Sequence, residues 1–375
     1  MAEKELHLFI IWEKARTMED KILQTIQNNF TILERRYITW PKDVFSKNLT
    51  RFYGENLPSS SKKIQECGDG EFILVIVEDS SPVYKPRLTT KGCKVVNVNM
   101  FDAKELFRFW TGSSRVHGTN SQAEVDHDLT LLTGKNSRDY IKYYQENKSN
   151  EPIITHSDSE LIGAKGWKSI EEFFYVLNNC IDYVILRNFE EMPEKITMGK
   201  HGDVDFLCYN LKQMVLLSNS KPVFRSKDRV RNVVNIANEE LFCDFRYIGD
   251  GYYDKQWEED ILSRRVFFKN LFYVPDERNL YYTLLYHALI QKNKIADDYV
   301  EKLKTYRGAQ NEELPINSRV LLIKELISYL KEKGYSISTP KDYSVVMNVK
   351  DTGAKSSTSY FLKHEAYKAI RRIKR

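Results

Sequence analysis

The first third of the chain alternates short apolar runs with amphipathic stretches. The runs at 7–12 (HLFIIW), 31–38 (TILERRYI) and 72–77 (FILVIV) predict strands, and the third is apolar throughout, as in a strand buried on both faces. Residues 18–30 carry apolar side chains at helical spacing, and a helix is expected over 41–52, where a proline suits the first turn. Strands and helices that interleave in this order predict an α/β or α+β domain with helices packed on a sheet.

A second set of elements follows a polar interval. Residues 136–165 are rich in Asn and Ser, so we interpret them as a linker between a first domain, 1–135, and a second domain, 166–305. A helical pattern from residue 279 onward continues into a helical tail, 306–375. The strands expected in the second domain are 183–187, 204–208 and 241–247.

The whole net charge of +5 can be assigned to the end of the chain. The segment 363–375 (KHEAYKAIRRIKR) holds six Lys or Arg and one Glu, so the rest of the chain sums to zero. Proteins that bind nucleic acid carry a broad basic surface, and nucleic acid is therefore not expected as a partner. The basic end itself predicts an amphipathic helix, either solvated or lying against an anionic surface.

Composition narrows the class of protein further. Hydrophobic residues make up 42% of the chain, which excludes disorder as its main state. No apolar run reaches the roughly 18 residues of a membrane span, and the first residues do not resemble a signal peptide. The five cysteines form no CxxC pair, which predicts free thiols and no structural zinc. Together these features predict a cytoplasmic globular protein.

The densest chemical signal of the first domain is a histidine before a helix. His117 and Gly118 come just before Asn120 and Ser121, either of which can cap the next helix, and Ser121 with Glu124 fits a capping box. A helix N-terminus presents free backbone N–H groups that attract phosphate. The pattern indicates a phosphate site, or alternatively a simple loop and cap with a hydrogen-bonded histidine.

The residue types around His117 suit phosphoryl transfer. Imidazole accepts a phosphoryl group well when its other nitrogen is oriented by a partner, and Asp128 on the following helix is the candidate partner. Gly118 would permit close approach of a phosphate, and Thr119 would offer it a hydroxyl.

The segment HGTN before the Ser121 helix resembles the active-site segment of nucleoside diphosphate kinases, where the histidine is phosphorylated. The order of elements over residues 4–134 is similar too. The resemblance implies a ferredoxin-like βαββαβ sandwich in which His117 accepts the phosphoryl group, Thr119 lies beside it and Asp128 orients its ring.

The chain departs from that family at positions that bind phosphate. The family's lysine falls on Trp12, although Lys14 is close by, and its asparagine falls on Ser114. Broad nucleotide exchange therefore does not follow. The loose candidates for phosphate contacts in the shortened nucleotide loop are Arg87, Thr90 and Arg108.

The second domain carries two acids on one predicted strand. Asp203 and Asp205 are two residues apart, so their carboxylates leave the same face. Magnesium prefers such oxygen ligands, and Asp244 on another predicted strand would supply a third. The alternative is a strand edge with solvated acids.

This strand and its surroundings resemble the polymerase-β-like nucleotidyltransferase superfamily over residues 167–303. Arg187 matches the arginine of the family's preceding strand, whereas Asn188 replaces a glycine and the usual Gly-Ser pair is not evident. The resemblance implies a mixed sheet with a helical tail, Mg²⁺, a nucleoside triphosphate or CDP-linked donor, and a small-molecule or glycan acceptor. Related fukutin-like and choline-transferase-like proteins imply surface-polysaccharide synthesis.

Further candidates lie near these acids. A helical stretch carries Tyr281, Tyr282, Tyr286 and His287, which we interpret as core and interface. His287 with Lys292 and Lys294 could instead contact phosphates. A solvated strand face or a triphosphate clamp is predicted from Lys227, Arg229 and Arg231.

The sequence therefore predicts a two-domain enzyme that transfers a nucleotidyl or phospho-substituted group with magnesium at Asp203, Asp205 and Asp244. In this hypothesis the first domain binds or rephosphorylates a nucleotide. One alternative is a phosphotransferase that works through phosphohistidine at His117. Another is a nucleotide-sensing or assembly protein without turnover. Homo-oligomerisation is left open.

Overall fold

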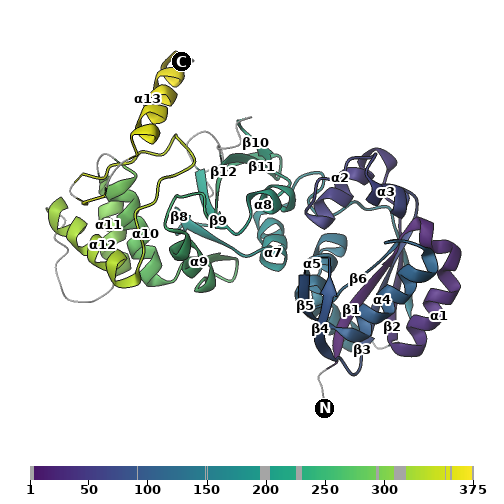
Figure 1. The fold of residues 1–375 in the computed structure, drawn as a ribbon. Helices are drawn as coiled ribbons and strands as arrows, with labels where there is room; N and C mark the ends of the chain where they lie inside the picture. Colours follow the sequence, from purple (N-terminus) through teal and green to yellow (C-terminus); the bar gives the residue numbers. More distant parts are fainter. Residues whose placement is uncertain are drawn as a thin grey trace. The chain divides into compact units, whose positions relative to one another are not determined.

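The computed structural model contains two compact units with mixed α and β structure, Met1–Trp167 and Lys168–Arg375 (Figure 1). None of the helices in the described part of the chain has both the length and the apolar character that a bilayer span requires. The structure describes residues 4–90, 92–147, 149, 151–194, 203–224, 230–292, 295–307, 318–350, 352–354 and 357–373.

The first unit is built on a five-stranded sheet in the order β6-β1-β3-β2-β7. Neighbours among the first four are antiparallel, and the edge strand β7 runs parallel to β2. The central strand β3 has a continuous buried run, as its apolar sequence predicts. The bounds are β1 Glu5–Ile11, β2 Thr31–Ile38, β3 Phe72–Asp79, β6 Val116–Gly118 and β7 Ile153–Ser157.

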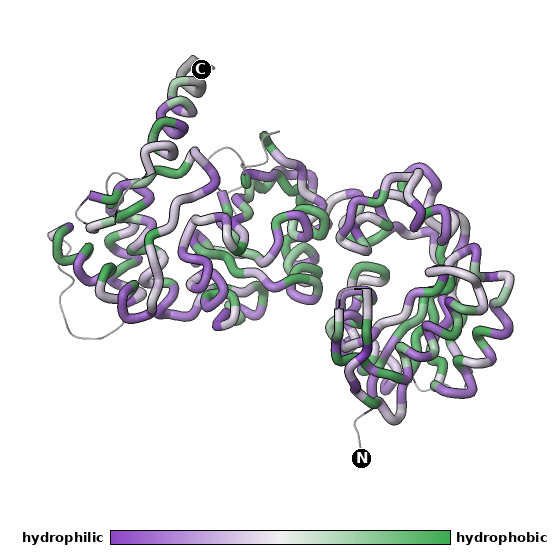
Figure 2. Tube along the Cα trace, viewed as in Figure 1, coloured by the Kyte–Doolittle hydropathy of each residue, from purple (hydrophilic) through white to green (hydrophobic). Residues whose placement is uncertain are grey.

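Helices pack on this sheet and close a hydrophobic core. The helices are η1 Glu13–Met18, α1 Glu19–Asn29, α2 Lys42–Tyr53, α3 Lys62–Cys67, α4 Val98–Thr111, α5 Gln122–Thr133 and α6 Ser137–Glu146, and a separate two-stranded ribbon is formed by β4 Tyr84–Thr89 and β5 Gly92–Asn97. Phe9, Val75, Ile22 and Phe107 represent one core cluster, which joins β1 and β3 to α1 and α4. In Figure 2 the central strands of this unit are mainly hydrophobic, which agrees with their burial.

The segment 136–165 is not the interdomain linker that its composition predicts. It contains α6 and β7, and β7 joins the first unit's sheet beside β2. Its polar composition has a structural cause, because α6 buries only Ser137 and Tyr140 among its residues and β7 is a half-exposed edge strand. The division between units lies at Trp167.

The second unit is built on a mixed sheet in the order β10-β11-β12-β9-β8. Strands β9 and β12 are parallel, whereas β8 pairs with β9 and β11 with β12 in antiparallel fashion. This arrangement places β9 and β12 side by side at the middle of the sheet. The bounds are β8 Tyr183–Arg187, β9 Asp203–Cys208, β10 Lys221–Pro222, β11 Arg231–Ile236 and β12 Glu239–Tyr247.

The helices at the end of the chain share the core of this second unit. Leu285 of α10 and Leu326 of α12 belong to one buried cluster with Val184 of β8 and Trp257 of α9. The predicted tail is therefore helical and partly packed against the sheet domain. The helices are α7 Ile170–Cys180, α8 Leu211–Leu217, α9 Lys255–Ser263, α10 Glu277–Ile290, α11 Asp297–Arg307, α12 Arg319–Lys333 and α13 Thr358–Ile373, and a small ribbon is formed by β13 Val266–Phe268 and β14 Phe272–Val274.

Candidate functional site

His117 lies on the short strand β6, just before α5. The Ser121 side chain caps α5 by accepting from the Glu124 backbone N at 3.4 Å. The Glu124 carboxylate accepts from the backbone N of Asn120, the residue before the cap, at 2.7 Å, so this contact is shifted by one residue from the predicted capping box. Pairing of β6 with β1 and this cap hold the histidine between a strand end and a helix start.

Asp128 of α5 contacts His117 directly. The Nε2 of His117 lies 2.6 Å from Asp128 Oδ2, and His127 Nδ1 lies 2.8 Å from Oδ1 of the same carboxylate. Burial favours the neutral acid, but His117 and His127 outweigh it and hold the pKa of Asp128 below its ordinary value. The carboxylate thus orients the ring through Nε2. The Nδ1 atom of His117 has no hydrogen-bond partner among the residues that the structure describes.

A cavity of about 520 Å³ lies beside His117 and is lined by the half-buried Lys63 and the buried Lys104. Lys63 Nζ donates to the Ser114 carbonyl at 2.9 Å, and Lys104 Nζ donates to the Gly118 carbonyl at 3.3 Å. Burial lowers the pKa of Lys63, and lowers that of Lys104 to about 8. Neither lysine forms an ion pair with a carboxylate of the described chain, so the cavity offers them to an anion.

Several residues predicted for this pocket lie elsewhere. Lys14 Nζ donates to the Gln65 carbonyl at 2.7 Å and does not line the cavity. Arg87 pairs with Asp102 at 3.3 Å and does not line it either. Of the predicted residues, the cavity lining includes Thr90, Arg108, His117 and Gly118.

Gly118 and Thr119 both have a packing role. A Cβ on Gly118 would lie 2.9 Å from the Phe9 ring, so glycine is needed where β6 pairs with β1. The Thr119 hydroxyl is fully buried, 3.1 Å from His7 Nδ1, and accepts from the Leu8 backbone N at 3.2 Å. The predicted role of Thr119 beside a phosphate is therefore wrong.

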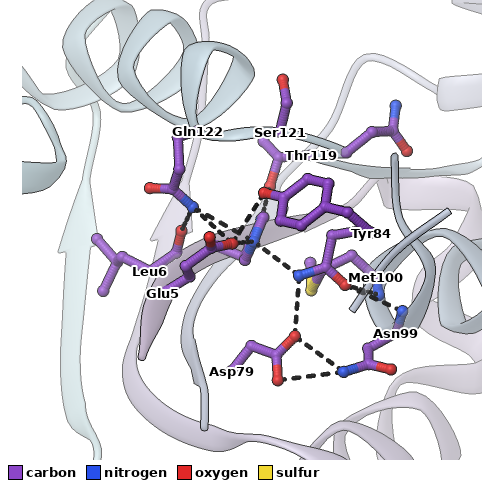
Figure 3. A network of polar contacts seen from close by, with 12 residues as sticks. Glu5, Leu6, Asp79, Tyr84, Asn99, Met100, Thr119, Ser121 and Gln122 are labelled. Carbon is purple, nitrogen blue, oxygen red and sulfur yellow. Dashed lines mark hydrogen bonds and ion pairs between the residues drawn. The ribbon is translucent and has the colours of Figure 1, made fainter. Parts of the chain in front are cut away.

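Figure 3 shows the polar network to which Thr119 belongs. Asn97 donates to Asp79 at 2.9 Å and lies 3.1 Å from His7 Nε2. Burial lowers the pKa of His7 below its ordinary value despite the nearby acids Glu5 and Asp79, so the imidazole is a neutral member of the network. The network links β1, β3 and the N-terminus of α4, and has a structural role.

In the second unit the strand register brings the predicted acids together. Asp205 of β9 pairs with Asp244 of β12 on one side and with Arg187 of β8 on the other. Asp203 lies two residues before Asp205 on the same strand. All four side chains line a cavity of about 360 Å³.

Each of these acids is close to an arginine. Arg231 Nη2 lies 2.6 Å from Asp203, and Arg187 Nη2 lies 3.0 Å from Asp205. Arg246 lies farther from Asp244, at 3.6 Å. Lys227, Arg229 and Lys294, which were further candidates for phosphate contacts, fall outside the described residues.

Asp244 is the least satisfied acid of the group. Its Oδ1 is buried and has no hydrogen-bond partner among the described residues. Burial, and next the charge of Asp205, raise the pKa of Asp244 to about 6. Burial also raises the pKa of Asp203, although Arg231 opposes the shift.

The three acids supply the oxygen ligands that a divalent cation prefers, but each of them contacts an arginine and they are not gathered around one point. Among the described residues, no three acidic, histidine or cysteine side chains form a ready metal-binding group. Their arginine partners neutralise part of the charge. A cation bound here would give the unpartnered Asp244 Oδ1 a ligand contact. It would also offset the repulsion between the carboxylates, which contributes to the raised pKa of Asp244.

The remaining wall of this cavity comes from the helical end of the unit. Sequence reasoning named His287 and Lys292 in this wall but missed Gln291. The i, i+4 spacing of His287 and Gln291 was a usable signal, because such residues share a helix face. The wall residues include Tyr252, His287, Gln291, Lys292 and Tyr299.

The chain was also compared with known proteins. No family model matches it, and no curated protein is a significant match. What supports a function for this chain is therefore the geometry of its two cavities.

Proposed function

We propose that the chain is a magnesium-dependent transferase that moves a nucleotidyl or phospho-substituted group at the Asp203, Asp205 and Asp244 cavity. The observation that carries this proposal is the register that aligns Asp205 with Asp244, together with the buried, unpartnered Oδ1 of Asp244. An unsatisfied buried carboxylate oxygen is costly, and a polar cavity that holds one beside two further acids suits a cation and a phosphate-bearing substrate.

The chain's own residues have distinct roles in this proposal. Asp203, Asp205 and Asp244 would hold the metal, which supplies charge neutralisation at the reacting phosphate. Arg187 and Lys292 also line the cavity and bind the substrate's phosphate oxygens. Burial of Arg187 behind Tyr252 keeps this cation fixed in place, since its Nη2 donates to the tyrosine hydroxyl at 2.8 Å.

The sheet supports the same proposal. The resemblance to the nucleotidyltransferase superfamily implies a mixed sheet with an arginine on the strand before the acidic one and a third acid later in the chain. In the structure the acids lie on two adjacent parallel strands, with Arg187 on the antiparallel neighbour. A nucleoside triphosphate or CDP-linked donor and a small-molecule or glycan acceptor follow from that resemblance, with surface-polysaccharide synthesis as the setting.

The test is magnesium-dependent release of pyrophosphate from the four nucleoside triphosphates, with glycerol as acceptor. Asp205→Asn should lower the rate by at least ~100-fold, because charge stabilisation at the reacting phosphate is lost. Asp182→Asn is the matched control, since Asp182 also pairs with an arginine but does not line the cavity. An unchanged rate in Asp205→Asn would remove the assignment.

A second function, phosphotransfer through His117, is favoured by a separate observation. The 2.6 Å contact between His117 and Asp128 leaves Nδ1 as the nitrogen that can be phosphorylated, beside a cavity with Lys63 and Lys104. The strand order β6-β1-β3-β2 is also the one expected for a ferredoxin-like sandwich. Acid-labile labelling from γ-labelled ATP that vanishes in His117→Ala but persists in Asp205→Asn would support this function.

A further inference from the structure

His287 occupies a defined place in the wall of the second cavity. It lies on α10, is buried, and has Gln291, the C-cap residue of the same helix, four residues later. The two side chains are hydrogen-bonded, with His287 Nδ1 and Gln291 Oε1 2.8 Å apart. This pair lies outside the carboxylate set, and its chemistry depends on which imidazole nitrogen carries the proton.

The orientation of the Gln291 amide is fixed by a backbone carbonyl. Its Nε2 donates to the Tyr252 carbonyl at 2.8 Å. Rotation of the amide by 180° would place two oxygens at that distance, with no proton between them, and is excluded. Gln291 Oε1 therefore faces His287, and because a carbonyl oxygen can only accept, the proton of the neutral ring lies on Nδ1.

The other ring nitrogen is consequently an acceptor. In this tautomer His287 Nε2 carries a lone pair, and it has no hydrogen-bond partner among the described residues. The Tyr252 hydroxyl lies 3.0 Å from Nδ1 rather than from Nε2, and it accepts a hydrogen bond from Arg187. The geometry thus leaves one basic atom of the ring for whatever enters the cavity.

The surroundings of His287 keep it neutral before substrate binds. Burial, and then the positive charge of Arg187, lower the pKa of His287 well below its ordinary value. A phosphate-bearing substrate would bring negative charge near Arg187 and so raise the proton affinity of Nε2 when it is needed. The charged and titratable groups that line the cavity with this ring are Arg187, Asp203, Asp205, Asp244, Arg246, Tyr252, Lys292 and Tyr299.

We propose that His287 Nε2 accepts the proton of the substrate hydroxyl that attacks phosphorus, and that Gln291 positions it for this step. The proposal rests on the proposed transferase function. The hydroxyl O–H bond breaks and its proton passes to Nε2, while the new O–P bond forms. The bond from phosphorus to the leaving phosphate oxygen breaks, and that oxygen keeps the electron pair. The proton on His287 is then released to solvent.

The first test reads the tautomer on the full chain without any substrate. Nitrogen NMR of the labelled imidazoles, with the His287 signals assigned by their loss in His287→Gln, should show a neutral ring with its proton on Nδ1 at pH 7. Gln291→Ala should weaken that preference. A wild-type ring with its proton on Nε2 would overturn the proposal whatever the activity of the protein.

The second test is the pH dependence of pyrophosphate release with magnesium nucleoside triphosphates and glycerol. The wild-type rate should fall toward acid pH as His287 becomes protonated. His287→Gln keeps a hydrogen-bond acceptor but cannot take the proton. Its rate should therefore be at least about 100-fold lower than that of the wild type, and its pH profile should lack the acid limb. Gln291→Ala should retain the limb with a smaller loss of rate.

A matched control separates this role from a structural one. His364 is a buried histidine of the same unit that does not line the cavity, and His364→Gln should leave both the rate and the acid limb unchanged. An acid limb that persists in His287→Gln would overturn the role of His287 and assign the limb to Asp244, with its pKa of about 6. Wild-type rates in Asp205→Asn would instead show that the transferase function itself has failed.

Discussion

Lys104 and Lys14 are two lysines of the first unit with opposite surroundings. Lys104 is buried beside His117, whereas Lys14 reaches away from the cavity to the Gln65 carbonyl. We expect pyrophosphate to raise the melting temperature of wild-type protein and of Lys14→Gln by several degrees, and that of Lys104→Gln by less than half as much. Thermal unfolding at increasing pyrophosphate concentrations measures this, and equal shifts in all three proteins would place the anion elsewhere.

Asp244 should make stability depend on pH in an identifiable direction. Its folded pKa of about 6 lies above the ordinary carboxyl value, so its protonated form stabilises the fold at low pH and this contribution is lost as pH rises through about 6. Asn resembles the protonated acid. Asp244→Asn should therefore match wild type near pH 4 and exceed it by on the order of 2 kcal/mol at pH 7.5.

Denaturant unfolding at the two pH values measures the Asp244 effect, and magnesium provides the internal control. If the metal binds at this acid, adding it at pH 7.5 should stabilise wild type more than Asp244→Asn. A variant that is less stable than wild type at both pH values would contradict the expected sign.

Some site residues follow from local rules and others do not. The shared face of Asp203 and Asp205 follows from the two-residue period of a strand, which any strand obeys. The burial of the Thr119 hydroxyl against Leu8 depends on a partner 111 residues away in the chain. Spacing around His117 carries no information about that partner, which is why the predicted role of Thr119 was wrong.

Asn97 shows how one side chain can hold an element in place. It caps α4 by accepting from the Asn99 and Met100 backbone N atoms, and its amide donates to Asp79 inside the buried network. Asn97→Ala removes a cap and leaves the Asp79 carboxylate short of a donor. We expect a loss of about 2–4 kcal/mol in the free energy of unfolding.

Asn136 provides the comparison for Asn97, because it caps α6 from a half-exposed position. Asn136→Ala should cost only about 1 kcal/mol. Chemical denaturation of both variants measures the difference. Equal losses would mean that the buried contacts of Asn97 add nothing to its capping role.

At the scale of elements, the central apolar strand could be predicted, whereas the polar edge strand β7 could not. β3 is apolar throughout, so its sequence alone indicates a central strand. β7 alternates between half-buried and exposed residues at a sheet edge, and α6 turns most of its surface to solvent. The composition of β7 and α6 is close to that of a linker. What distinguishes them is contact with β2: β7 pairs with this strand, and Tyr140 of α6 accepts a hydrogen bond from its Arg36 side chain.

At the scale of the whole molecule, an experiment on fragments can determine whether the first unit ends at residue 135 or at residue 167. Cutting after residue 135, where the sequence pattern suggests, removes β7 from β2 and also removes the Ile162 carbonyl to which the buried Arg51 donates at 2.7 Å. The Tyr144 hydroxyl bond to the buried Glu34 carboxylate is lost as well. Fragment 1–135 therefore has an exposed sheet edge, and the buried Arg51 and Glu34 side chains each lose a hydrogen-bond partner.

Fragment 1–167 keeps all of these contacts and should unfold in one cooperative transition. Its midpoint should match the transition that core substitutions in the first unit, such as Phe9→Ala, shift in the full chain. Fragment 1–135 should melt at least ~5 °C lower or aggregate, because a unit of roughly this size loses about 2–4 °C per kcal/mol and more than one buried contact is broken. Calorimetry of both fragments measures this, and equal midpoints would show that α6 and β7 are dispensable and that residues 136–165 act as a linker after all.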